Sequence, residues 1–240
     1  MVSLPLTVSD YRKNILYPSA SSVAFAFEGG YTQRDTFKNG VGYWMKFANN
    51  QSFSIIGVNR STDTFSVVDK WNIIGSISAA VPTNNISQIP SGIVNSLYFG
   101  YDEGYYQAAT IEPGKAYWVK TNGGGKLALS SSVAARLTSN QNEQKKEEAL
   151  TPNSLNIEPQ STIAKAKARK QQLFFGHANT FSQDMSVYEL PPVPPSGSAD
   201  VRFASNRLAE LIPDELTEPK EFALKVQSNG LPMKLSWTIN

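Results

Sequence analysis

The chain has no cysteine and a single histidine among its 240 residues. The absence of cysteine excludes disulfides and thiolate metal sites. One histidine, His177 in "FFGHANT", argues against a transition-metal site, and no GxSxG nucleophile elbow accompanies it. We interpret His177 as a turn or surface residue, and we expect no metal, no cofactor and no enzymatic activity.

Strong charge of one sign and long apolar runs are also missing. Lysine and arginine number 22 against 20 acidic residues, a net charge of +2, so we expect no nucleic-acid partner. No stretch approaches 18 consecutive apolar residues, so we expect no membrane span. The opening residues "MVSLPLTVSDYRK" lack the charged and then apolar pattern of a signal peptide.

The carboxylates do not form a recognisable catalytic pair. Glu28, Asp102 and Glu103 fall at hairpin turns, where acidic side chains commonly accept local backbone hydrogen bonds. A glycosidase would need two carboxyl groups flanking one bond. Solvated turn residues are the favoured interpretation.

What the sequence does contain is an internal repeat. Residues 23–47 match residues 97–121 without a gap at an offset of 74. The matched pairs include Phe25 with Phe99, Phe27 with Tyr101, Gly30-Tyr31 with Gly104-Tyr105, and Tyr43-Trp44 with Tyr117-Trp118. A repeat of about 70 residues is the size of a small domain. The chain is therefore expected to contain two copies of one fold unit.

Each copy has the pattern of β structure. "VAFAF" and "LYFGY" alternate with period two, and the glycines that follow indicate hairpin turns. The strands "VGYWMKF" and "KAYWVKT" would come next, with "SFSIIGV" and "KLALSSS" as closing strands. In the first copy Trp44 and Lys46 would share one strand face, and Trp118 and Lys120 repeat this arrangement.

The first copy opens abruptly. Trp71-Asn72 precedes the first strand of the second copy, whereas Met1 stands in register with Ile73, so the first copy lacks this pair. We expect Met1 to mark a cut within a longer protein, or an incomplete gene model. Strands with unpaired edges are then expected at both ends of the chain.

The last third differs in composition. Residues 133–149 are polar and charged and are predicted to form a linker, with a helical turn or two near 141–149. Residues 191–195 contain four prolines, which favours polyproline II geometry. "EFALKVQS" and "LPMKLSWTI" alternate as strands around an "SNG" turn. We therefore predict an all-β chain: repeat domains at 1–68 and 69–132, the linker, and a β-sandwich-like domain at 150–240.

Two of these segments resemble known proteins. "WNIIGSIS…FGY…GYYQAATIEPGKAYWVK" resembles the "GWNLIS…GYW" units of large secreted proteins from Bacteroidota and Ignavibacteria, and "YELPPVPPSGSADVRFAS" with "PMKLSWTI" resembles the segment that often follows those units. Such proteins commonly end in a sorting tail for type IX secretion. The resemblance implies an extracellular or cell-surface location, although this sequence carries neither signal peptide nor sorting tail.

Aromatic residues supply the candidate contact sites. Trp44 with Lys46, and Trp118 with Lys120, could stack on sugar rings if exposed, but burial of each indole with the lysine at the rim is favoured. Tyr31, Tyr105 and Tyr106, beside the turns, are the better candidates for exposed contact. Function is expected to be that of a non-catalytic extracellular module: a spacer, a surface or adhesive domain, or a filament subunit formed by strand addition between neighbouring copies. The alternative is a carbohydrate-binding module with polysaccharide as its partner.

Overall fold

Strands make up nearly all of the regular structure. The computed structural model describes residues 1–49, 51–131, 152–159, 171–215, 218–227 and 233–240. Within these ranges the helical elements are short: α1 (Lys13–Leu16), η1 (Thr83–Asn85), η3 (Ala178–Thr180) and η4 (Met185–Tyr188). The all-β prediction is confirmed. The predicted linker, its helical turn and the "SNG" turn lie outside the described residues.

The chain divides into two compact units. Unit 1 comprises residues 1–100 and 107–142, and unit 2 comprises residues 101–106 and 143–240. Unit 1 thus holds most of both predicted repeat domains. The boundary expected between those two domains stays a prediction.

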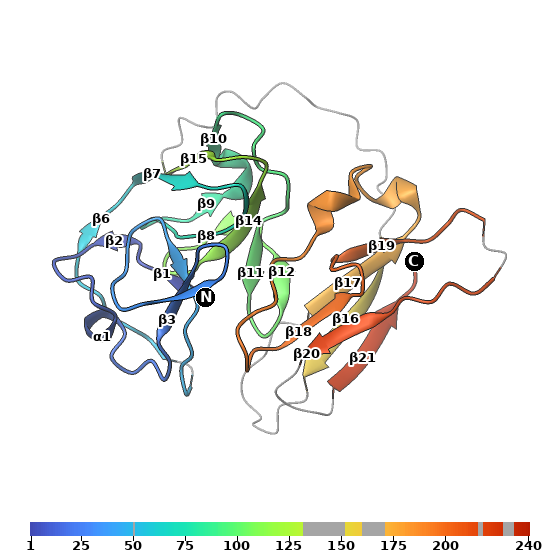
Figure 1. Ribbon diagram of the computed structural model, residues 1–240, viewed down its shortest axis with the longest axis horizontal. Coiled ribbons are helices and arrows are strands. Elements are labelled where there is room, and N and C mark those ends of the chain that lie inside the picture. The colour runs from blue at the N-terminus through green and yellow to red at the C-terminus, as the bar shows by residue number, and fades with distance from the viewer. Residues whose placement is uncertain (50, 132–151, 160–170, 216–217, 228–232) are drawn as a thin grey trace. The chain divides into compact units, whose positions relative to one another are not determined.

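Unit 1 is assembled from many short strands (Figure 1). They are β1 (Val2–Ser3), β2 (Leu6–Thr7), β3 (Ala24–Phe27), β4 (Tyr31–Arg34), β5 (Gly42–Tyr43), β6 (Val58–Asn59), β7 (Thr62–Val67), β8 (Lys70–Ile74), β9 (Val81–Pro82), β10 (Ser87–Ile89), β11 (Phe99–Tyr101), β12 (Tyr105–Gln107), β13 (Thr110–Ile111), β14 (Tyr117–Thr121) and β15 (Gly125–Ser130), with the tip of the β11–β12 hairpin assigned to unit 2. The larger sheets have the orders β12-β11-β14-β8 and β10-β15-β7. The remaining pairs are β1-β5, β2-β6, β3-β4 and β9-β13.

One predicted strand is absent from its expected place. Residues 51–57, most of "SFSIIGV", adopt no strand, and Ile56 is almost fully exposed. The closing strand β15 instead pairs with β7, which follows that segment. The alternation of "SFSIIGV" resembles a strand, but Phe53 and Ile55 pack against the core from an irregular segment.

The same hydrogen bonds occur at equivalent positions of the two copies. At the hairpin tips, Glu28 N–H donates to the Gly30 carbonyl over 2.9 Å and Asp102 N–H to the Gly104 carbonyl over 3.0 Å. Further along each copy a tyrosine hydroxyl accepts a backbone hydrogen bond: Lys38 N–H donates to Tyr43 Oη over 2.9 Å, and Glu112 N–H donates to Tyr117 Oη over 3.0 Å. A serine hydroxyl does the same for each lysine: Lys46 N–H donates to Ser22 Oγ and Lys120 N–H donates to Ser96 Oγ, both over 2.8 Å. The shared letters therefore accompany a shared local structure.

The two copies also contact each other reciprocally. Ser3 N–H donates to the Gly114 carbonyl over 2.8 Å, and Gly75 N–H donates to the Gly40 carbonyl over 2.9 Å. Ser3 and Gly75 occupy the same place in their copies, and so do Gly40 and Gly114. The first strand of each copy thus bonds to a turn of the other, which is the pattern of a pseudo-twofold interface.

This contact overturns the expectation of an unpaired first strand. Val2 pairs with Tyr43 of β5 and also forms a bridge with Lys115. The Ser3 hydroxyl is buried and hydrogen-bonds to Ser76 Oγ at 2.8 Å and to the Lys115 carbonyl at 2.6 Å. The N-terminal strand therefore has partners from both copies.

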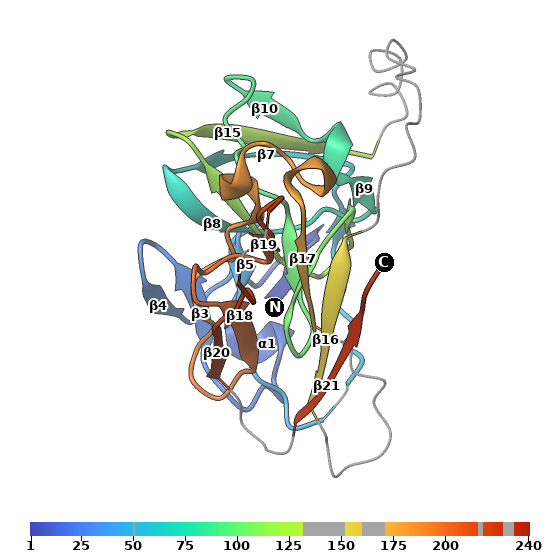
Figure 2. The ribbon, with the colours of Figure 1, turned by 90° about the vertical axis from the view of Figure 1, so that its right-hand side faces the viewer.

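Unit 2 is a small sandwich (Figure 2). Its strands are β16 (Asn153–Pro159), β17 (Gln171–Gly176), β18 (Asp200–Phe203), β19 (Ala209–Leu211), β20 (Leu224–Gln227) and β21 (Met233–Thr238). One sheet has the order β19-β17-β16-β21 and the other consists of β18 and β20. The Gln171 side chain links them, donating to the Val201 carbonyl (2.5 Å) and accepting from its N–H (3.1 Å).

The proline-rich segment is held by side-chain donors. Three of its proline carbonyls accept hydrogen bonds from side chains. Arg202 Nη1 donates to the Pro191 carbonyl (2.9 Å), Tyr105 Oη to the Pro192 carbonyl (2.7 Å) and Gln227 Nε2 to the Pro194 carbonyl (3.4 Å). Proline has no N–H, so its carbonyl is the only backbone group that can bond. Side chains from three other segments therefore fix this segment in unit 2.

Candidate functional site

Trp118 lies at the centre of an aromatic cluster in unit 1. The indole is completely buried on β14. Its ring meets Phe27 edge-on at a centroid distance of 4.8 Å and Trp71 at 6.1 Å and 90°. Edge-to-face packing at these distances is favourable for aromatic pairs. The cluster therefore joins side chains from both copies.

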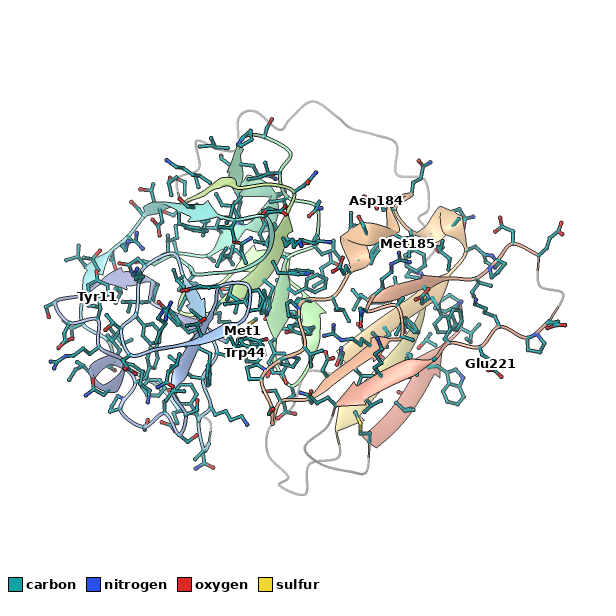
Figure 3. The ribbon with its side chains drawn as sticks, in the orientation of Figure 1. Met1, Tyr11, Trp44, Asp184, Met185 and Glu221 are labelled. Carbon is teal, nitrogen blue, oxygen red and sulfur yellow. The ribbon has the colours of Figure 1, made fainter. Side chains whose placement is uncertain are left out.

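Trp44 belongs to the same neighbourhood. Tyr31 stands edge-on to both indoles, 6.5 Å from Trp44 and 6.4 Å from Trp118. Trp44 is 5% exposed and lies among the densely packed side chains of unit 1 (Figure 3). Three candidate contact residues are thus brought together, but the two indoles offer no open face for stacking on a sugar.

The two lysines take different environments. Lys46 is exposed and Lys120 is half-buried, with Trp71 as its partner across the β14–β8 pair. In both cases the backbone N–H is bound by the equivalent serine hydroxyl described above. Trp44 and Trp118 are buried, as the sequence favoured. The position of the lysine side chains at the rim of these indoles stays a prediction.

Tyr105 corrects an expectation from the sequence. We predicted exposure beside the turn, but Tyr105 is fully buried in unit 2. Its hydroxyl donates to the Pro192 carbonyl, and the Arg202 guanidinium lies 5.9 Å from its ring centroid. Tyr106 and Tyr31 are half-buried. Position beside a turn does not reveal which segment will cover a side chain.

Next to Tyr105 lies a buried ion pair that sequence reasoning missed. Arg202 binds Asp200 bidentately, through Nε at 2.6 Å and Nη2 at 3.0 Å. Both side chains are nearly inaccessible to solvent. The Asp-x-Arg spacing on one strand puts the two side chains on the same face, which was the available signal. With Arg202 also bonded to Pro191, the pair fixes structure.

A neighbouring tyrosine is similarly constrained. The Tyr101 hydroxyl donates to the Ala199 carbonyl over 2.8 Å. Burial raises the pKa of Tyr101 well above its ordinary value, because the phenolate would be poorly solvated there. Tyr101 thus stays a neutral hydrogen-bond donor at physiological pH.

The histidine and the turn carboxylates singled out from the sequence are exposed to solvent. His177 is exposed, and its Nδ1 lies 3.3 Å from an exposed carboxylate oxygen of Asp214. Glu28, Asp102 and Glu103 are exposed as well. Among the described residues, no group of three or more His, Cys, Asp or Glu side chains could hold a metal ion.

Across the described ranges, no helix is long and apolar enough to cross a bilayer. The helical elements described there are single turns.

Comparisons with known proteins give no relatives. No protein-family model matches the chain, and no curated protein or solved structure matches it. The resemblance to "GWNLIS…GYW" proteins stays a prediction.

Proposed function

We propose that this chain is a non-catalytic structural module of a secreted or cell-surface protein, acting as a spacer or adhesive domain between neighbouring parts. The observation that carries the proposal is the reciprocal bonding of the two copies, Ser3 to Gly114 and Gly75 to Gly40. Such an arrangement favours mechanical integrity, because the N-terminal strand cannot leave without breaking contacts to both copies.

The use of the aromatic residues supports the same role. Trp44, Trp118 and Tyr105 are buried and contribute to packing. Buried aromatic side chains contribute strongly to stability and give a single well-packed state. The extracellular setting, export by type IX secretion and tandem-repeat classification rest on the sequence resemblance. Partners under this proposal are flanking domains or neighbouring copies.

Stretching single molecules tests the proposal. The full chain is tethered at its two ends and pulled, which loads β1 directly. Unit 1 should resist the applied force and then unfold in one cooperative event. Ser3→Ala should lower the force at which unit 1 unfolds. Stepwise peeling of unit 1 from its N-terminus at low force would overturn the spacer role.

A polysaccharide screen addresses the carbohydrate-binding alternative. Soluble and insoluble polysaccharides are tested for retention of the full chain. The variants are Lys46→Ala, at an exposed candidate position, and Tyr106→Ala, at a half-buried one. A structural module should show no retention that depends on these side chains. Retention lost in either variant, with folding intact, would replace the proposal by the alternative.

A further inference from the structure

Strand β21 forms one edge of the larger sheet in unit 2. It pairs with β16 on one side, and no strand of the described ranges pairs with its other side (Figure 2). An edge strand presents unpaired N–H and C=O groups, which proteins usually cover or protect. β21 carries no proline or bulge that would protect it within Met233–Thr238.

The odd-numbered face of β21 is apolar and exposed. Leu235 and Trp237 are 49% and 68% exposed, and Ile239, the residue that follows the strand, is 65% exposed. Leu235 stands opposite Ile157 of β16, which is buried in the sandwich core. Residues opposite each other on paired strands share one face. The core face of the sheet therefore continues outward onto β21, where the described part of the chain leaves it uncovered.

The even-numbered face is polar and carries one charge. Lys234 stands opposite Glu158 of β16, so its charge has an acidic neighbour within the same sheet. Ser236 and Thr238 complete this face. A strand added to β21 thus meets one apolar face and one polar face.

We propose that β21 is a homotypic docking edge, which pairs antiparallel with β21 of a second copy across a twofold axis at Ser236. In this register Leu235 lies opposite Trp237 of the second copy. If the pairing extends one residue beyond β21, Met233 lies opposite Ile239. On the polar face Lys234 lies opposite Thr238, and Ser236 lies opposite its own equivalent. The segment is self-complementary: apolar residues meet apolar residues, and no like charges are placed together.

We assign the open edge of β21 to a second copy of this chain because the sequence of β21 is complementary to itself in the antiparallel register described above. The alternative of head-to-tail addition would need an unpaired strand near the N-terminus, but Val2 already pairs with Tyr43 and Lys115. A twofold contact through β21 closes on itself and gives a dimer, whereas a head-to-tail contact would give a filament. This inference deepens the proposed structural role by naming one partner, and a monomer would leave the spacer role standing.

Sedimentation and light scattering over a concentration series test the dimer. A contact through six-residue strands is small, so a weak, concentration-dependent equilibrium is expected. Trp237→Lys and Leu235→Glu should each raise the dissociation constant about tenfold or more, because each removes two apolar cross-strand pairs.

The double variant L235E/W237K should regain affinity, since each introduced carboxylate then lies opposite an introduced ammonium group of the other copy. A chain that stays monomeric at high concentration overturns the proposal.

Cysteine crosslinking fixes the register. The natural chain has no cysteine, so Ser236→Cys introduces a single thiol on the proposed axis. Mild oxidation should give a disulfide-linked dimer, whereas Ser91→Cys, at an exposed turn of unit 1, should crosslink far less. Equal crosslinking of the two variants, or failure of the L235E/W237K double variant to restore association, would overturn the twofold register. Both variants are checked for native circular dichroism, and the charge variants change side chains that are already exposed.

Discussion

Ser3 and Gly114 are joined by a 2.8 Å backbone hydrogen bond that connects the first strand of one copy to a turn of the other. The equivalent bond from Gly75 to Gly40 is 2.9 Å long. Both copies are therefore expected to unfold together, because the loss of either first strand removes contacts from the other copy.

Ser3→Ala tests this coupling. The substitution removes a buried hydroxyl that binds Ser76 and Lys115, leaving polar groups without their partner. We expect a loss of about 2–3 kcal/mol in the free energy of unfolding. Urea unfolding followed by tryptophan fluorescence measures it, since three of the four tryptophans lie in unit 1. Ser9→Ala, at an exposed position, serves as the control. Two separate transitions within unit 1 would contradict the coupling.

Gly42→Ala tests the packing between the copies. A Cβ at Gly42 would overlap Ile73 and Ala116, and Ala116 is the equivalent of Gly42 in the second copy. We expect a destabilisation of about 1–3 kcal/mol from overpacking. The double variant G42A/A116G should recover part of this loss, because it removes one of the overlapping methyl groups. Thermal unfolding of the single and double variants gives the comparison; additive losses would show that the two positions do not share this space.

Alkaline pH should weaken unit 1. Burial raises the pKa of Tyr98 to about 12, and no described group forms a hydrogen bond with its hydroxyl. Because the folded pKa exceeds the ordinary value of 10.0, the unfolded state loses its proton first. The stabilising effect is complete below pH 10 and is lost as pH rises from 10 to 12. Tyr98→Phe should therefore make the free energy of unfolding fall less steeply between pH 10 and 12, by about 1.4 kcal/mol per pH unit.

Tyr17→Phe provides the matched comparison. Burial raises its pKa to about 12 as well, but its hydroxyl donates to the Ser3 carbonyl over 3.2 Å. At neutral pH we expect Tyr98→Phe to be nearly neutral and Tyr17→Phe to cost about 1 kcal/mol. Urea titrations at several pH values measure both effects. A decline unchanged by Tyr98→Phe would contradict the assignment.

The Asp200–Arg202 pair should be essential to unit 2. Asp200→Ala leaves the buried guanidinium without its counter-ion, which we expect to cost about 3–5 kcal/mol. Replacing both residues by apolar ones of similar size should cost less than this single change. Hydrogen exchange of the peptides covering β17 and β18 in the full chain reports on unit 2 alone. Unchanged exchange in Asp200→Ala would show that the pair contributes little.

Local features of this fold could be predicted from the sequence, and tertiary partners could not. The hairpin glycines between β3 and β4 and between β11 and β12, and the alternation around Tyr117, placed turns and strands correctly, because these depend on neighbouring residues. The predicted strand "VGYWMKF" is a strand only at Gly42–Tyr43. The strands predicted to form a hairpin around "SNG", β20 and β21, lie in different sheets. Tyr105 was misjudged, since its partner Pro192 is distant in sequence. The pairing of Val2 with Lys115 was missed for the same reason. The ion pair was missed because acidic and basic residues are usually solvated.

The reciprocal bonds also constrain how such a module can be inherited. A segment carrying residues 1–68 alone would lose the Gly114 acceptor of Ser3 and the Gly75 donor to Gly40. Gene rearrangements that copy or delete one repeat would thus yield a poorly folding product, whereas those moving both repeats would preserve these bonds between the copies. The smallest segment expected to keep these bonds contains both copies, and expression of 1–68 by itself should give an unfolded or aggregating polypeptide.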